Sequence, residues 1–310
     1  MARRIFITGA AGLVGQNLIA HIEQQGPAEI VGLDKHAHNL AVLARLHPDV
    51  RLIESDCATS GEWEKVLGEC DELILLHAQI GGLSAAEFER NNVAATRRVL
   101  EAAARGRVSH IVHVSSSVVN SRAQDLYVQT KKQQEALVSA SAIPHVILRP
   151  TLMFGWFDRK HMGWLMRFLR RAPLFPIPGS GKYLRQPLYA GDFCAIVLAC
   201  MQRGMVGEYN ISGLSRIDYI DLIRELRRVS GARTPIVRLP YSVFRLLLAT
   251  YALFDRDPPF TTAQLRALVI PELFEVIDWP AIFQVTPTPL HEALERTFND
   301  PRFADVALRF

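Results

Sequence analysis

The 310-residue sequence predicts an α/β fold, a doubly wound parallel sheet with a smaller and mostly C-terminal second domain. Up to about Pro150, short apolar and β-branched runs alternate with longer amphipathic stretches, which is typical of a sheet covered by helices on both faces. Beyond Pro150 the alternation fades, and prolines and glycines break the chain into loops. The second half is therefore expected to form a lid rather than to extend the sheet.

Six runs have the composition of strands that are buried on both faces, because they are almost entirely apolar inside. They are Arg4 to Thr8, Glu29 to Asp34, Arg51 to Ser55, Glu72 to His77, His110 to Ser115 and His145 to Arg149. The clearest helices between them are Leu13 to Gln25, Ala85 to Arg105 and Tyr127 to Ala142. Two further helices are expected near Asp192 and Asp218.

Bulk composition argues against several classes of protein. A net charge of +4 with a pI near 9.0 is mild and mixed along the chain, so an anionic small-molecule ligand is expected and a nucleic acid is not. The His, Cys and acidic residues show no metal-site spacing, so no metal is expected. The four cysteines form no CxxC motif and fit a reducing cytoplasm.

No signal peptide or membrane span is expected. The N-terminus leads directly into a strand, and the longest apolar stretch, Tyr241 to Phe254, contains Arg245 and is shorter than the roughly 20 residues that a span needs. This stretch and the basic, amphipathic run from Lys160 to Arg171 could instead touch a lipid surface from outside. The alternative is a helix buried in the small domain and a lid helix.

A glycine-rich turn follows the first strand. Gly9, Gly12 and Gly15 stand three residues apart between a strand and a helix. Gly9 allows a tight turn, Gly12 allows close approach of a pyrophosphate, and Gly15 allows the helix to pack on the strand. The segment therefore predicts a dinucleotide site of the Rossmann type, although a purely structural turn has the same spacing.

An acidic residue ends the second strand. Asp34 lies 19 residues after Gly15, where a carboxylate can bind the adenosine ribose hydroxyls. This charge favours NAD over NADP, although Lys35 and His36 could reduce that preference. Asp56 follows the third strand and could contact the adenine, or it could be an ordinary loop aspartate.

Tyr127 and Lys131 stand four residues apart at the start of a predicted helix, so their side chains share one face. A nearby ammonium favours the phenolate of a tyrosine, and each pKa unit requires roughly 1.4 kcal/mol of differential interaction. Upstream, the fifth strand ends in Ser115, Ser116 and Ser117, at the sheet edge where open α/β sheets bind ligands. A serine there can hydrogen-bond a reacting oxygen.

In this order, the glycine turn, the strand-end serines and the YxxxK pair resemble the extended short-chain dehydrogenase/reductase family, in its NAD-dependent epimerase/dehydratase branch. The resemblance covers roughly Arg3 to Ser212 and includes Asn92, Arg149-Pro150 and the stretch from Arg185 to Asp192. It implies hydride transfer between a nicotinamide and a hydroxyl or keto carbon. The Rossmann domain would comprise residues 1–152 and about 186–205, and the lid about 153–185 and 206–310.

The resemblance also implies residue roles. Tyr127 would be the acid/base, Lys131 would hold the nicotinamide ribose and tune Tyr127, and Ser117, the third serine, would orient the substrate oxygen. Asn92 would have a structural or relay role, and His77 would lie beside the cofactor or serve as a hydrogen-bonded core histidine. The full cofactor set is Gly9, Ala11, Gly12, Leu13, Val14, Asp34, Asp56, Cys57, His77, Ala78, Asn92, Tyr127 and Lys131.

The substrate is less closely defined. In nucleotide-sugar members of the family, the arginine aligned with Arg185 contacts a diphosphate, so a nucleotide-linked sugar is the leading expectation and a surface ion pair is the alternative. The RxGD-type segment usual in such members is missing, and the C-terminal part is closer to atypical relatives of a respiratory complex I accessory subunit. A dehydrogenase for a sterol-like or isoprenoid-like alcohol and a non-catalytic NAD(P)-binding assembly subunit therefore remain open. Family resemblance further implies a homodimer through Ala85 to Arg105 and Tyr127 to Ala142.

Overall fold

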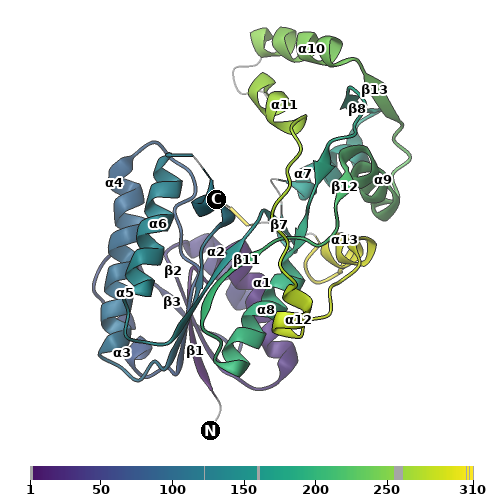
Figure 1. Ribbon diagram of the computed structural model, residues 1–310. Helices are drawn as coiled ribbons and strands as arrows, with labels where there is room; N and C mark the ends of the chain where they lie inside the picture. The colour runs from purple at the N-terminus through teal and green to yellow at the C-terminus, as the bar shows by residue number, and fades with distance from the viewer. Residues whose placement is uncertain are drawn as a thin grey trace.

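The computed structural model describes residues 3–121, 123–158, 161–254, 261–304, 306 and 308–309. A seven-stranded parallel sheet lies at its centre, in the order β11-β6-β5-β4-β1-β2-β3 (Figure 1). The strands are β1 (Arg4–Thr8), β2 (Glu29–Asp34), β3 (Arg51–Glu54), β4 (Glu72–Leu75), β5 (His110–Val114), β6 (His145–Pro150) and β11 (Gly207–Ile211). This confirms the predicted fold class and all six predicted strands, with small differences at their ends.

Helices cover both faces of the sheet because successive strand residues point to opposite sides. Ile5 and Ile7 of β1 enter one core, with α1 (Leu13–Gln25), α2 (Ala37–Leu46), α8 (Ala190–Arg203) and α12 (Trp279–Phe283). Phe6, between them, enters a second core on the other face, with α3 (Trp63–Gly68), α5 (Ala95–Ala104) and α6 (Leu126–Ser139). The sheet is thus doubly wound, as the sequence predicts.

Two predictions about element boundaries need correction. The seventh strand, β11, lies in a stretch that the sequence assigns to the lid from residue 206 onward, but it pairs in parallel with β6 at the sheet edge. Its sequence lacks an apolar run because Gly207 and Glu208 are exposed. The expected single helix from Ala85 to Arg105 is divided into α4 (Ala85–Phe88), a π-helical turn η1 (Glu89–Ala94) and α5.

The lid has a core of its own. It is built from α7 (Met162–Arg171), α9 (Tyr219–Ser230) and α13 (Leu290–Asn299). Short strand pairs complete it: β8 (Phe175–Pro178) with β13 (Ile236–Leu239), β9 (Leu184–Arg185) with β12 (Ile217–Asp218), and β7 (Met153–Phe154) with β10 (Leu188–Tyr189). The apolar face of α7, with Met166 and Leu169, is buried in this core and is therefore not available to a lipid surface.

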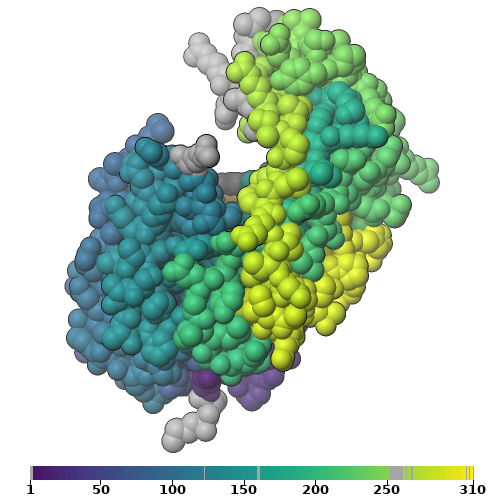
Figure 2. Space-filling model, viewed as in Figure 1, coloured from purple at the N-terminus to yellow at the C-terminus, as the bar shows by residue number. Residues whose placement is uncertain are grey.

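Two helices extend from the lid core. These are α10 (Tyr241–Phe254) and α11 (Thr262–Leu268), which lie at the end of the lid that is farthest from α12 (Figure 1). The space-filling view shows the surface hollowed between the sheet domain and the lid (Figure 2). Of the helices in the described part of the chain, none is both long and apolar enough to cross a membrane.

The C-terminal segment returns from the lid to the sheet domain. Phe303 packs against Trp156, with ring centroids 4.4 Å apart. Farther on, the backbone N–H of Arg309 donates to Asn39 Oδ1, and Asn39 Nδ2 donates to the Arg309 carbonyl, both at 2.9 Å. These contacts join the end of the chain to the start of α2.

Candidate active site

The glycine turn has the geometry that a dinucleotide requires. Gly9 has φ +67°, and a Cβ at this position would lie 2.8 Å from the His77 backbone nitrogen. A Cβ at Gly15 would lie 2.4 Å from the Ala10 carbonyl oxygen, so α1 can pack on the turn only through a glycine. No side chain caps the N-terminus of α1, which begins after Gly12. Its first-turn N–H groups, including those of Leu13 and Val14, therefore suit the negative charge of a pyrophosphate.

Asp34 presents its carboxylate beside this turn. Its Oδ2 accepts a 3.0 Å hydrogen bond from the Ala11 backbone, and its Oδ1 accepts one of 3.0 Å from His36. The Lys35 ammonium instead donates to Asn91 Oδ1 at 2.9 Å. Lys35 therefore does not neutralise Asp34 by direct contact, and the geometry fits ribose hydroxyls better than a 2′-phosphate.

The predicted adenine-side residues have partners within the protein. Asp56 accepts a hydrogen bond from the Ala58 N–H at 2.9 Å and pairs with Arg90 at 2.8 Å. Burial raises the pKa of Asp56, but this hydrogen bond together with Lys35 and Arg90 outweighs burial and lowers the pKa. Burial raises the pKa of the Cys57 thiol to about 12, so this group stays protonated and inert at neutral pH.

His77 is a hydrogen-bonded neutral histidine. Its Nδ1 lies 2.8 Å from Thr8 Oγ1, and its Nε2 lies 3.0 Å from Thr96 Oγ1. Burial lowers its pKa to about 3, with a smaller contribution from Lys131. The His77 side chain therefore connects β1 to α5. The His77 backbone, which precedes Ala78, packs against Gly9.

Asn92 joins the loop after β4 to the helix that carries the YxxxK pair. It is fully buried on η1, and its Oδ1 accepts a 2.6 Å hydrogen bond from the Gln79 N–H. Its Nδ2 donates to the Gln79 carbonyl at 3.1 Å and to Thr130 Oγ1 at 2.9 Å. These contacts give Asn92 a structural role, and the π-helical turn lets its side chain reach both partners.

Lys131 and Tyr127 lie near the carboxyl end of β5. The Lys131 side chain is buried, and its Nζ donates to the Val114 carbonyl at 3.1 Å. Burial lowers the pKa of Lys131 to about 7. Burial also raises the pKa of Tyr127, and a hydrogen bond with Ser116 opposes this rise. The expected tuning of Tyr127 by Lys131 stays a prediction.

The three strand-end serines have different surroundings. Ser115 is buried, and its hydroxyl has no hydrogen-bond partner among the described residues. Ser116 caps the 3₁₀ turn η2 (Ser117–Asn120), accepting from the Val118 N–H, and its hydroxyl also bonds to Tyr127. Ser117 begins that turn. Ser116 is thus the serine that acts on the pKa of Tyr127. The role of Ser117, to which the sequence points, stays a prediction.

Arg185 holds the lid together. Its guanidinium donates to the carbonyls of Leu184, Leu268 and Ile270, and burial lowers its pKa. It also borders a cavity of about 70 Å³ just beyond β6. Most of the other residues around this cavity are apolar: Leu152, Met153, Phe154, Met162, Pro187, Leu222 and Phe274, with His161, Gln186 and Glu272. The predicted contact of Arg185 with a diphosphate stays a prediction.

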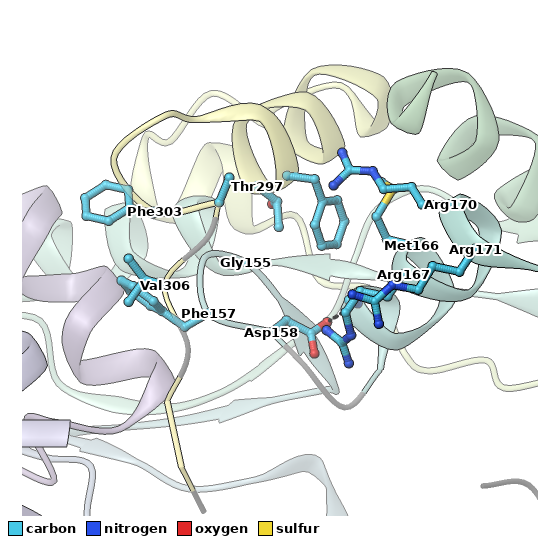
Figure 3. A pocket seen from close by; sticks show the side chains of 13 residues that line it. Gly155, Phe157, Asp158, Met166, Arg167, Arg170, Arg171, Thr297, Phe303 and Val306 are labelled. Atoms are coloured by element: carbon cyan, nitrogen blue, oxygen red, sulfur yellow. Dashed lines mark hydrogen bonds between the residues drawn. The ribbon is translucent and has the colours of Figure 1, made fainter. Parts of the chain in front are cut away.

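A second cavity, of about 250 Å³, lies between α7, α13 and the C-terminal segment (Figure 3). Arg167, Arg170 and Arg171 border one side, and Phe303 and Val306 border another (Figure 3). It contains none of the residues that the sequence singles out for catalysis or cofactor binding. The candidate active site is therefore the sheet edge near Tyr127 and not this cavity.

Comparison with known proteins gives one family. The family model described as "NAD dependent epimerase/dehydratase family" matches residues 5–212. A 4-hydroxy-2-methyl-3-oxo-4-farnesyl-3,4-dihydroquinoline-1-oxide ketoreductase of Stigmatella aurantiaca is 25% identical over 267 residues, covering 78% of this chain and 78% of the relative. A dTDP-glucose 4,6-dehydratase of Streptomyces niveus is 25% identical over 271 residues, covering 76% of this chain and 80% of the relative.

Among solved structures, UDP-glucuronic acid 4-epimerase from Bacillus cereus in complex with NAD has the same fold. It aligns with a TM-score of 0.74 at 21% identity, covering 96% of this chain and 97% of the epimerase. The residues matched by the family model include the glycine turn, the strand-end serines, Tyr127, Lys131 and Arg185. The chain therefore belongs to the NAD-dependent epimerase/dehydratase family and is, as the sequence predicts, an NAD-dependent enzyme of the extended short-chain type.

Proposed function

We propose that the protein transfers hydride between NAD and a hydroxyl or keto carbon held beside Tyr127, and that the substrate is a nucleotide-linked sugar. The observation that carries this proposal is the placement of Tyr127, hydrogen-bonded to Ser116 and near the buried Lys131, at the carboxyl edge of the sheet. Open α/β sheets bind ligands at this edge. The uncapped glycine turn lies at the same edge.

When bound, NAD supplies the hydride acceptor or donor. Tyr127 would give a proton to the substrate oxygen or take one from it, and Ser116 would hold the same oxygen by a hydrogen bond. Lys131 would hold the ribose while remaining bonded to Val114, and Asn92 would fix α6 in position through Thr130. The proposed mechanism therefore uses Tyr127 to transfer the proton. Ser116, Lys131 and Asn92 hold other groups in position.

The dTDP-glucose dehydratase relative supports the nucleotide-linked sugar, as does the presence of Arg185 at the border of the cavity beyond β6. Titration calorimetry of the NAD-loaded protein with dTDP-, UDP- and GDP-sugars, followed by product analysis, tests this class. We expect one nucleotide series to bind and to be converted, and Tyr127→Phe to bind it without conversion. Absence of both binding and conversion for every sugar nucleotide would overturn this substrate class.

A second candidate is an apolar alcohol or ketone. Leu152 is 53% exposed next to β6, and most residues around the adjacent cavity are apolar. Three hydrogen bonds to backbone carbonyls occupy much of the Arg185 guanidinium. The ketoreductase relative is named for a farnesyl-bearing substrate. Consumption of NADH with a prenylated ketone, and none with any sugar nucleotide, would favour this candidate.

We also propose that the protein is a homodimer. Its unpaired cysteines further suggest that it resides in the reducing cytoplasm. The helices α5 and α6, through which the family resemblance implies pairing, lie next to each other on one outer face of the sheet domain (Figure 1). All four cysteines are buried and free. Light scattering on the eluted protein would give the mass, and a monomer at micromolar concentration would contradict the dimer.

A further inference from the structure

One face of α10 exposes an apolar stripe. Val243, Leu246 and Leu247 are 43%, 64% and 54% exposed. They lie at positions i, i+3 and i+4, so they share one face of the helix. The exposed Thr250 continues the same face one turn farther on.

The opposite face of α10 is also apolar and already packs on the protein. Tyr241, Phe244 and Leu248 are half-buried. A surface helix of a globular protein normally turns polar residues outward and one apolar stripe inward. The outward stripe of α10 therefore has no role in the lid core, and large exposed apolar patches mark interaction sites.

Two more large apolar side chains are exposed on or next to the strand pair from which α10 emerges. Val237 of β13 is 38% exposed, and Leu174, just before β8, is 44% exposed. These two strands pair in parallel, and α10 begins two residues after β13 ends. Figure 2 shows this end of the lid as a projecting part of the surface.

Two segments that lead into this end of the lid are basic in sequence. Residues 159–191 contain seven Lys and Arg and no Asp or Glu, and residues 226–254 contain five and again none. The β8–β13 pair brings the two segments together. Arg233, Arg238 and Arg245 are exposed and make no ion pair with any residue that the structure describes.

We propose that the outer face of α10, with the neighbouring basic surface, binds the surface of a bilayer that contains anionic lipid. An apolar helix face with arginines beside it is the combination that lies in the headgroup region of such a bilayer. Exposed Lys and Arg side chains near a membrane are attracted to its anionic headgroups. A second copy of this chain would instead bring a surface of the same charge, which opposes self-association through this face. This surface is separate from the active site, and the proposal does not depend on the substrate.

The test is co-sedimentation of the full-length, NAD-loaded protein with vesicles of phosphatidylcholine alone or with added phosphatidylglycerol. We expect binding that increases with the phosphatidylglycerol fraction and decreases with salt. The double variant Leu246→Glu, Leu247→Glu is expected to lose at least tenfold in apparent affinity. The pair Arg238→Glu, Arg245→Glu is expected to lose binding to anionic vesicles in particular.

The matched control is Leu83→Glu, because Leu83 is fully exposed on the sheet domain, away from α10. It is expected to bind vesicles as the unaltered protein does, and circular dichroism should show all variants folded. Equal binding by the unaltered protein and the α10 variant, or no binding of the unaltered protein to anionic vesicles, would overturn the proposal. So would light scattering in which the α10 variant converts a dimer into a monomer while vesicles have no effect, since the face would then join two copies.

Discussion

The sheet domain and the lid differ in how completely they bury their apolar side chains. In the sheet domain, alternate residues of each strand enter one of two continuous cores, and the polar residues near the site are mostly hydrogen-bonded to one another. The lid has one core, and α10 leaves leucines exposed. The cofactor half is therefore built for fixed geometry, whereas the lid leaves apolar surface exposed.

Replacing Tyr127 with Phe should have the largest effect on activity. The change removes the proton-transfer group while keeping the ring, so we expect kcat to fall by roughly 10²- to 10⁴-fold. NAD affinity, measured by calorimetry, should stay the same. Retention of more than a tenth of the activity would mean that another group transfers the proton.

Ser116→Ala and Ser117→Ala form a matched pair. Ser116 bonds to Tyr127, whereas Ser117 begins the next turn, so only the first change should lower kcat, by about tenfold to a hundredfold. Ser117→Ala should stay within about twofold. If steady-state kinetics gave the reverse result, Ser117 and not Ser116 would be the functional serine.

Lys131→Met should change how stability depends on pH. The pKa of Lys131 is about 7 in the folded protein and near 10.5 when unfolded. Between these values the unfolded chain binds more protons, so the stability of the unaltered protein rises with pH across this window, by up to roughly 1.4 kcal/mol per pH unit. Methionine does not titrate.

The quantity to measure is the Tm of the unaltered protein minus the Tm of Lys131→Met, in thermal melts without NAD. This difference should be lowest near pH 7 and rise toward pH 9.5. A constant Tm difference across this range would show that Lys131 keeps an ordinary pKa in the fold. Lys132→Met provides the control, because Lys132 is exposed on the same helix.

Arg185→Gln should have the smallest effect on the chemical step. The arginine joins β9 to the carbonyls of Leu268 and Ile270, so we expect a loss of roughly 1–3 kcal/mol in stability by urea unfolding. If Arg185 also contacts a diphosphate, KM for the sugar nucleotide should rise while kcat changes little. A normal KM with lowered stability would leave Arg185 a purely structural role.

Much of the cofactor half could be predicted from sequence because its signals are local. The spacing of Gly9, Gly12 and Gly15 and the four-residue step from Tyr127 to Lys131 depend on single turns of backbone. The structure places the glycines where β1 turns into α1 and the pair on α6. Strands that are buried on both faces can also be recognised in the sequence as apolar runs.

The remaining features depend on contacts between distant segments. β11 carries polar residues because it lies at the sheet edge, so pairing with β6 rather than composition defines it. Two of the carbonyls that accept from Arg185, those of Leu268 and Ile270, are more than 80 positions away. An apolar run predicted α10, but only the packed lid shows which of its two apolar faces stays exposed.

The return of the C-terminal segment to Asn39 has a mechanical consequence. The chain passes between lid and sheet domain after β6, again around β11 and α12, and once more at this segment. Two domains that are joined at several points move less relative to each other than two domains that are joined by a single hinge. Any closure over a substrate should therefore consist of small sliding movements, and a fusion to the C-terminus would pull directly on the start of α2.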